Sequence, residues 1–204
     1  AIKEFNLDTL MYRSLWNPIK AAGRKLDFLT VTGAMALLGP VVLGLVVLLV
    51  RPDWLPPSWA PVMPYVAACI ALASVLKAFA ERTHARLAWF LLVMNHSFLA
   101  LSVAFNSPID VPSTLLYLGG IYVAAGVGVF ALERLRRHEG RIDLTRFHGH
   151  FYEHPRISFA VLLASLGISG FPITTAFLGA DLLFSHIKQD QLGLAVLFAL
   201  RFVV

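Results

Sequence analysis

Long apolar runs recur along this chain and alternate with short polar stretches. A membrane-spanning helix needs about 20 apolar residues to cross a hydrocarbon layer of roughly 30 Å. Four continuous runs predict membrane-spanning helices over 28–50, 62–80, 87–105 and 114–132. A fifth long run, over 157–178, is interrupted by glycine and proline, and a sixth begins near Leu192 and is cut short.

The first 27 residues follow a different pattern. Leu7, Leu10, Met11 and Leu15 recur at helical spacing, with charged residues between them. This spacing predicts an amphipathic helix that lies along the membrane or against a partner. The predicted fold is an all-α, polytopic transmembrane bundle over 28–204 with a discontinuous helix, preceded by a membrane-surface helix over 1–27. We expect it to be a fragment of a larger subunit.

Composition supports a membrane protein. Hydrophobic residues make up 58% of the chain and charged residues only 14%, against about 25% charged residues in soluble domains. That balance excludes a soluble single-core domain and a disordered chain. Cys69 is the sole cysteine, so the chain can form neither an internal disulfide nor a site built from several thiolates.

The net charge of +5 is explained by the location of Lys and Arg. They gather in the amino-terminal stretch, in the loop around Arg82 and Arg86, and in the arginine-rich loop after the fourth predicted span. All three segments fall on one side of the predicted bundle, and such segments face the cytoplasm. We therefore expect a multi-pass protein of the inner (plasma) membrane with a cytoplasmic amino-terminal end, and no nucleic-acid partner.

Ionisable groups at membrane depth are costly and usually functional. Lys77 lies near the end of the second predicted span, four residues before Glu81. Its ammonium either reaches the interface along its apolar stem or is buried and exchanges protons. His96 lies deeper, between Asn95 and Ser97, and either relays protons or makes a structural hydrogen bond between helices. Haem ligation would need a second histidine at matching depth, and His186 is too near the opposite surface, so we expect no cofactor.

The fifth span contains a break at Gly170 and Pro172. Irregular backbone at membrane depth must be enclosed by protein or line a hydrated cavity, so we expect the break to pack inside the bundle. Discontinuous helices also hold the ion sites of transporters. Asp181 is either the charged group of such a site or a cap on the next helix. His186 is a candidate exit to the non-cytoplasmic side.

Two further motifs carry expectations. The glycines of the fourth predicted span should allow close helix contact; they are Gly119, Gly120, Gly126 and Gly128. The loop 147–154 holds three histidines and a glutamate, a set that can ligate zinc or copper. Because histidine-rich loops are more often solvated or in contact with a partner, we expect no metal site.

Part of the chain resembles a known family. The stretch 165–181 reads SLGISGFPITTAFLGAD. It is similar to the S-L-x-G-(I/F)-P-x-x-x-x-F-x-(G)-(K/E) stretch of the antiporter-like membrane subunits of respiratory complex I and of multisubunit cation/proton antiporters. The residues 86–89 and 95–96 also resemble a family loop and the helix that follows it. This chain departs from the family at Ala180, where the family has an ionisable residue, and carries an acid only at Asp181.

The resemblance implies a proton- or cation-translocating subunit of a multisubunit energy-coupling complex, with protons or Na⁺ as the transported ion. Its relay residues would be Lys77, His96, Asp181 and His186. Other membrane and peripheral subunits would be its partners, and any redox or hydratase chemistry would reside in them. Two alternatives remain: the membrane subunit of an inorganic-carbon (bicarbonate/CO2) uptake complex of the DAB type, driven by a cation gradient, and a purely structural membrane anchor.

Overall fold

The computed structural model describes residues 7–54, 56–59, 61–106, 111–143, 149–185, 187 and 191–203. Within these ranges the chain is helical and has no strand. Helices α3 to α6, with one short helical turn between α3 and α4, are long and apolar enough to cross a membrane. The prediction of an all-α, multi-pass bundle is therefore confirmed. The four helices are α3 (Val31–Val50), α4 (Met63–Ala80), α5 (Ala85–Asn106) and α6 (Val111–Glu139).

Shorter helical elements precede, connect and follow these four. The fifth predicted span is present as two pieces, α8 and α9, and the sixth as α10. The remaining elements are α1 (Leu7–Met11), the π-helical turn η1 (Tyr12–Trp16), α2 (Asn17–Arg24), the 3-10 turn η2 (Pro52–Trp54), α7 (His150–Glu153), α8 (Pro155–Ile168), α9 (Thr175–Phe184) and α10 (Leu192–Val203).

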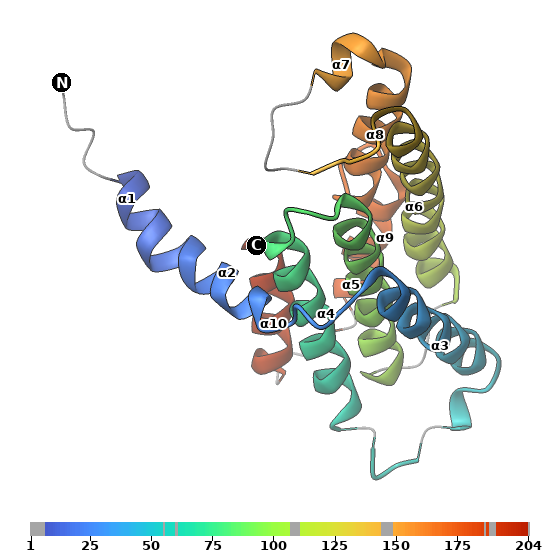
Figure 1. Ribbon diagram of the computed structural model, residues 1–204. Helices are drawn as coiled ribbons and strands as arrows, with labels where there is room; N and C mark the ends of the chain where they lie inside the picture. The colour runs from blue at the N-terminus through green and yellow to red at the C-terminus, as the bar shows by residue number, and fades with distance from the viewer. Residues whose placement is uncertain are drawn as a thin grey trace.

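Helix α5 is the centre of the bundle (Figure 1). Helices α3, α4 and α6 pack against it, α10 packs on α4, and α6 also carries α8 and α9. Of the apolar part of α5, 72% is buried within the chain, against 22% for α3. The core is built from large side chains that are almost fully enclosed, among them Leu91, Met94 and Leu99 of α5 and Tyr117 and Ile121 of α6.

The amino-terminal helices form an arm that leaves the bundle (Figure 1). Its inner part, α2, packs against α4, and the ring of Trp16 stacks on that of Phe79 with centroids 5.2 Å apart. Farther out, the apolar side chains of Leu10 and Met11 are exposed. The arm thus has an apolar surface that the described part of this chain does not cover. Such a surface is typical of an amphipathic helix.

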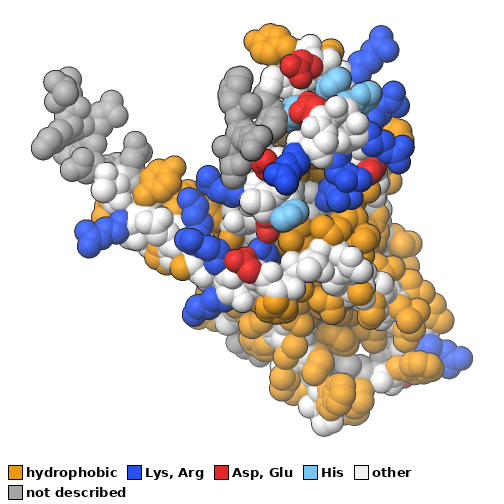
Figure 2. Space-filling view, viewed as in Figure 1, with side chains coloured by type: hydrophobic (Ala, Val, Ile, Leu, Met, Phe, Trp, Pro, Cys, Tyr) orange, Lys and Arg blue, Asp and Glu red, His pale blue; other side chains and the backbone are white. Residues whose placement is uncertain are grey.

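Charged side chains are unevenly distributed over the surface. Figure 2 shows Lys and Arg concentrated along α2 and towards the end that carries α7, while hydrophobic side chains cover most of the opposite half. This separation follows the loop pattern, since the basic loops adjoin α2, the α4–α5 turn and the end of α6.

Close contact between α5 and α6 depends on Gly128. The indole nitrogen of Trp89 donates to the carbonyl oxygen of Ala125 at 3.1 Å, and the indole ring lies over Gly128. Gly120 likewise lies against α9, so the expected close contacts hold for these two glycines. They do not hold for Gly119 and Gly126, where a Cβ atom added to the glycine would have no atom of another element within 4 Å. Seven residues make about two helical turns, so these two share one face, and that face is exposed.

We expect Gly128→Ala to destabilise the protein and Gly126→Ala not to. A Cβ atom at residue 128 would lie 1.9 Å from Cζ2 of Trp89, so the indole would have to move. Overpacking of this kind costs about 1–3 kcal/mol. Thermal unfolding in detergent measures both variants, and equal melting temperatures would contradict this account of the α5–α6 contact.

Candidate proton-relay site

Lys77 is held inside the protein between two carboxylates. Its side chain is 3% exposed, and Nζ donates to Oδ1 of Asp27 at 2.7 Å and to Oε2 of Glu81 at 2.8 Å. A buried ammonium is tolerated only when its charge is paired and its donors are satisfied. In the structure the Lys77 ammonium is thus paired with Asp27 and Glu81, and both interpretations of Lys77 stand.

Glu81 follows the last residue of α4 and is 8% exposed. Its second oxygen, Oε1, accepts hydrogen bonds from the backbone amides of Thr83 and His84, each at 3.1 Å, and from the Thr83 hydroxyl at 2.5 Å. Burial by itself raises the pKa of the Glu81 carboxyl, but the hydrogen bonds from Lys77, Thr83 and His84 outweigh it and lower the pKa to about 2. Glu81 is thus ionised at neutral pH.

The two carboxylates outnumber the single ammonium, so the Lys77 cluster carries one excess negative charge. A pocket of about 810 Å³ opens beside it, between α2 and the turn that joins α4 to α5. Lys20, Arg24 and Arg82 contribute to its wall together with Asp27, Lys77 and Glu81. Four basic side chains and two acidic ones give the pocket wall a net positive charge, so the pocket does not by itself concentrate cations near Lys77.

His96 joins α5 to α6. Its Nδ1 and the hydroxyl of Tyr117 lie 2.6 Å apart, and the two rings meet edge to face with centroids 5.8 Å apart. His96 is half-buried, while Tyr117 is 1% exposed. This hydrogen bond fits a structural role as well as a relay role, so both interpretations of His96 stand.

A small pocket lies beside His96. Its volume is about 250 Å³, and Asn95, His96, Ser165 and Ser169 are among the residues that line it. The Asn95 side chain is buried, and its Oδ1 has no hydrogen-bond partner among the described residues. A water molecule in a pocket of this size would satisfy that acceptor. The pocket lies between His96 and the end of α8.

The helix breaks where the sequence places Gly170 and Pro172. Helix α8 ends at Ile168, Gly170 takes the left-handed conformation with φ of 68°, and α9 begins at Thr175. The amide of Phe171 donates to the carbonyl of Leu166 at 3.0 Å, and that of Gly170 to Gly167 at 3.3 Å. This is the Schellman arrangement, which pairs the last carbonyls of a helix locally.

The expectation that the break packs inside the bundle is wrong for this chain. Phe171 and Ile173 are 42% and 88% exposed, and Pro172 is exposed too. The expectation assumed that the freed carbonyls need enclosure by other helices, whereas the local hydrogen bonds already satisfy carbonyls of the last turn of α8.

Asp181 also lies at the surface, on an exposed position of α9. Of the four predicted relay groups, the structure describes three, and two of these have different partners: Lys77 pairs with Asp27 and Glu81, and His96 with Tyr117. His186 lies outside the described residues.

Sequence reasoning missed two partners. Asp27 lies 50 residues before Lys77 in the sequence, and Tyr117 lies 21 residues after His96. The spacing of Lys77 and Glu81 was visible, because residues four apart meet on one helix face. Asp27 had one usable signal, since it is an acid placed directly before a long apolar run.

Comparison with curated proteins identifies relatives. Subunit N 1 of NADH-quinone oxidoreductase from Streptomyces griseus subsp. griseus is 30% identical over 144 residues, which is 70% of this chain and 30% of that protein. Subunit N from Mycobacterium sp. strain JLS is 30% identical over 167 residues, 80% of this chain and 34% of that protein. This chain is related to the antiporter-like membrane subunits of respiratory complex I.

The relationship has a defined extent. The chain spans about a third of the length of these subunit N proteins. No family model and no solved structure matches the chain. The resemblance drawn from the break motif is thus confirmed by subunit N sequences, over most of this chain's length.

The Glu81 carboxylate should stabilise the fold of this chain in a pH-dependent way. Its pKa is lowered in the folded state from 4.5 to about 2, so its contribution is complete above pH 4.5 and is lost as the pH falls to about 2. The shift corresponds to roughly 3 kcal/mol. We expect the wild type to have a higher melting temperature than Glu81→Gln at pH 6. This difference in melting temperature should shrink towards pH 3.

Asp53→Asn is the matched control, since Asp53 is an exposed acid in η2, before the opposite end of α4. Its melting difference from the wild type should be small at both pH values. A Glu81→Gln difference that stays constant from pH 6 to pH 3 would show that the Glu81 charge does not stabilise the fold.

Proposed function

We propose that this chain is part of a proton- or cation-translocating, antiporter-like membrane subunit of a multisubunit energy-coupling complex. The observation that carries the proposal is the buried ammonium of Lys77, shared by two carboxylates at the end of a membrane-spanning helix. Lys77 and Glu81 are the buried charged side chains among the described residues. Such groups are expensive to keep in a membrane bundle and commonly mark ion or proton pathways.

Both carboxylates stabilise the charged form of Lys77, so proton exchange at Lys77 would require its ion pairs with Asp27 and Glu81 to open. Asp27 is 63% exposed and connects the cluster to the basic pocket outside. The loss or gain of one proton changes the charge of the cluster, and this change is the event that transport would couple to movement of the arm or of α4.

His96 is the second relay group in this proposal. An imidazole titrates near neutral pH and can accept a proton at one nitrogen while it donates from the other. Nδ1 of His96 is engaged with Tyr117, and the pocket with Asn95 lies beside the ring. Water in that pocket would connect His96 to the end of α8. Asp181 and His186 remain in the proposal as the ionisable groups that follow the helix break in the sequence.

The location and partners follow from the same proposal. The basic side, with α2 and the end of α6, would face the cytoplasm, and the membrane would be the inner (plasma) membrane. Other membrane and peripheral subunits would complete the complex, as the name of the related subunit N proteins suggests. The transported ion would be a proton or Na⁺.

The test is proton flux into vesicles that contain the assembled complex. We expect the combined change Lys77→Ala, His96→Ala and Asp181→Ala to reduce flux by a factor of roughly 100 or more, the effect typical of lost proton-transfer groups. Lys25→Ala is the control, because Lys25 is an exposed lysine that follows α2. Its flux should equal that of the wild type, with complex assembly intact in every variant.

Unchanged flux in the triple variant would overturn the proposal and favour a structural membrane anchor. If flux falls in the triple variant, Asp181→Asn on its own decides the role of Asp181. If flux survives that change, Asp181 is not part of the relay and the pathway runs through Lys77 and His96.

A further inference from the structure

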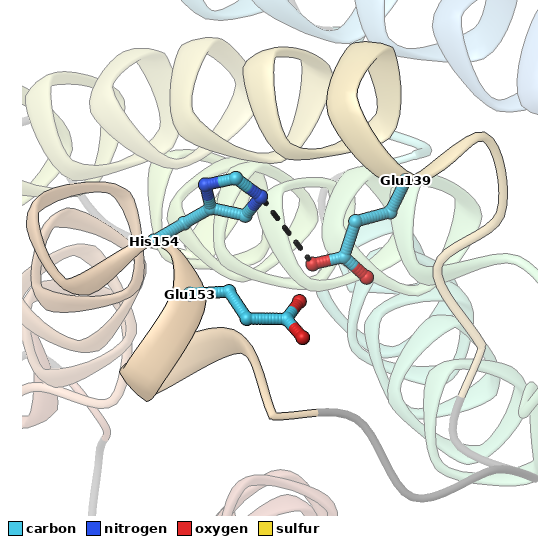
Figure 3. A group of neighbouring side chains, drawn as sticks. All are labelled: Glu139, Glu153 and His154. Atoms are coloured by element: carbon cyan, nitrogen blue, oxygen red, sulfur yellow. Dashed lines mark ion pairs between the residues drawn. The ribbon is translucent and has the colours of Figure 1, made fainter.

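A second group of ionisable side chains gathers at the basic end of the bundle. Glu139 is the last residue of α6, Glu153 is the last residue of α7, and His154 directly follows it. Figure 3 shows Glu153 and His154 on one side of a small space and the Glu139 carboxylate on the other. None of the three belongs to the Lys77 or His96 contacts described above.

The distances between these side chains suit a metal ion. One potential ligand atom from each of the three residues lies within 4.8 Å of the other two. Nε2 of His154 is 4.0 Å from Oε1 of Glu139. Two ligand atoms of a tetrahedral zinc, each about 2.1 Å from the ion, lie about 3.4 Å apart. Small rotations of these side chains, of which Glu153 is exposed, would close the remaining gap.

Neighbouring groups hold two of the three ligands in place. His150 is hydrogen-bonded through Nδ1 to Oε1 of Glu139, and the ring of His154 lies against that of His138 with centroids 4.8 Å apart. Hydrogen bonds to a ligating carboxylate fix its orientation and contribute to metal affinity. The side chains of Glu139 and His154 are 14% and 26% exposed, so the site is partly shielded from water.

Two carboxylates and one imidazole form the proposed ligand set. The nearby arginines Arg136 and Arg137 are engaged with Glu133, at 2.9 and 3.5 Å.

We propose that Glu139, Glu153 and His154 bind one divalent transition-metal ion, with Zn²⁺ as the best fit and water at the fourth position. One histidine and two carboxylates are a ligand set that zinc accepts. His150 is a positioning residue that acts through the Glu139 carboxylate. The ion would clamp the end of α6 to α7 and the start of α8. The histidine-rich loop alone did not indicate this site, because Glu139 lies well before it in the sequence.

The test is zinc titration of the full chain, purified in detergent without a polyhistidine tag, against a chromogenic zinc chelator. We expect one Zn²⁺ per chain. His154→Ala should weaken binding by roughly 100-fold and His150→Ala by roughly 10-fold, the range for lost ligands and their hydrogen-bonded supports. His84→Ala is the control, an exposed histidine that also neighbours a glutamate but lies outside the cluster.

Glu153→Gln is a second test variant that should still fold, because Glu153 is exposed and the change leaves the packing of the protein as it is. It too should weaken zinc binding by roughly 10-fold or more. The proposal is overturned if the wild type retains no Zn²⁺ against the chelator, or if His154→Ala and Glu153→Gln bind zinc as tightly as His84→Ala.

Discussion

The charge on Lys77 must be neutralised within the protein, and the pairing that achieves this organises one end of the bundle. The partners are unequal. Glu81 is buried, so its attraction to the ammonium is little screened, whereas Asp27 is 63% exposed and contributes less. Glu81 also accepts hydrogen bonds from the α4–α5 turn, and Asp27 follows the arm. One ammonium thus connects the arm, α4 and the turn into α5.

The two relay candidates lie on helices that are packed firmly together. Helix α5 is largely enclosed by α3, α4 and α6, and its contact with α6 is fixed by Trp89 lying on Gly128. His96 and Tyr117 meet across the same pair of helices. A group held on rigid elements keeps its geometry during proton transfer. The arm contacts the bundle through α2 and Asp27.

Most of the fold could be predicted from sequence, because long apolar runs admit few structures in a membrane. The span predicted over 62–80 is found as Met63–Ala80, and that over 28–50 as Val31–Val50. Helix α6 runs on to Glu139, seven residues past its predicted end, because its charged last turns are held by pairs such as Arg136 with Glu133.

The site was less predictable for two physical reasons. Spacing rules connect residues on one helix, so they indicated Lys77 with Glu81 but not Asp27 or Tyr117, which come from distant elements. The break at Gly170 was visible in the sequence, but its environment was not. Whether freed carbonyls need enclosure depends on local hydrogen bonds such as that from Phe171 to Leu166, which no residue pattern specified.

The central claim is that the Lys77 ammonium and its carboxylate partners act as one group in proton transfer, and a double-mutant cycle of Lys77 with Asp27 on proton flux tests it most directly. The cycle compares Lys77→Met, Asp27→Asn and the two changes combined, in vesicles that contain the assembled complex. If Asp27 acts through Lys77, the double variant is no slower than Lys77→Met alone. If the two losses add as free energies, Asp27 and Lys77 act independently and the account of this cluster is contradicted.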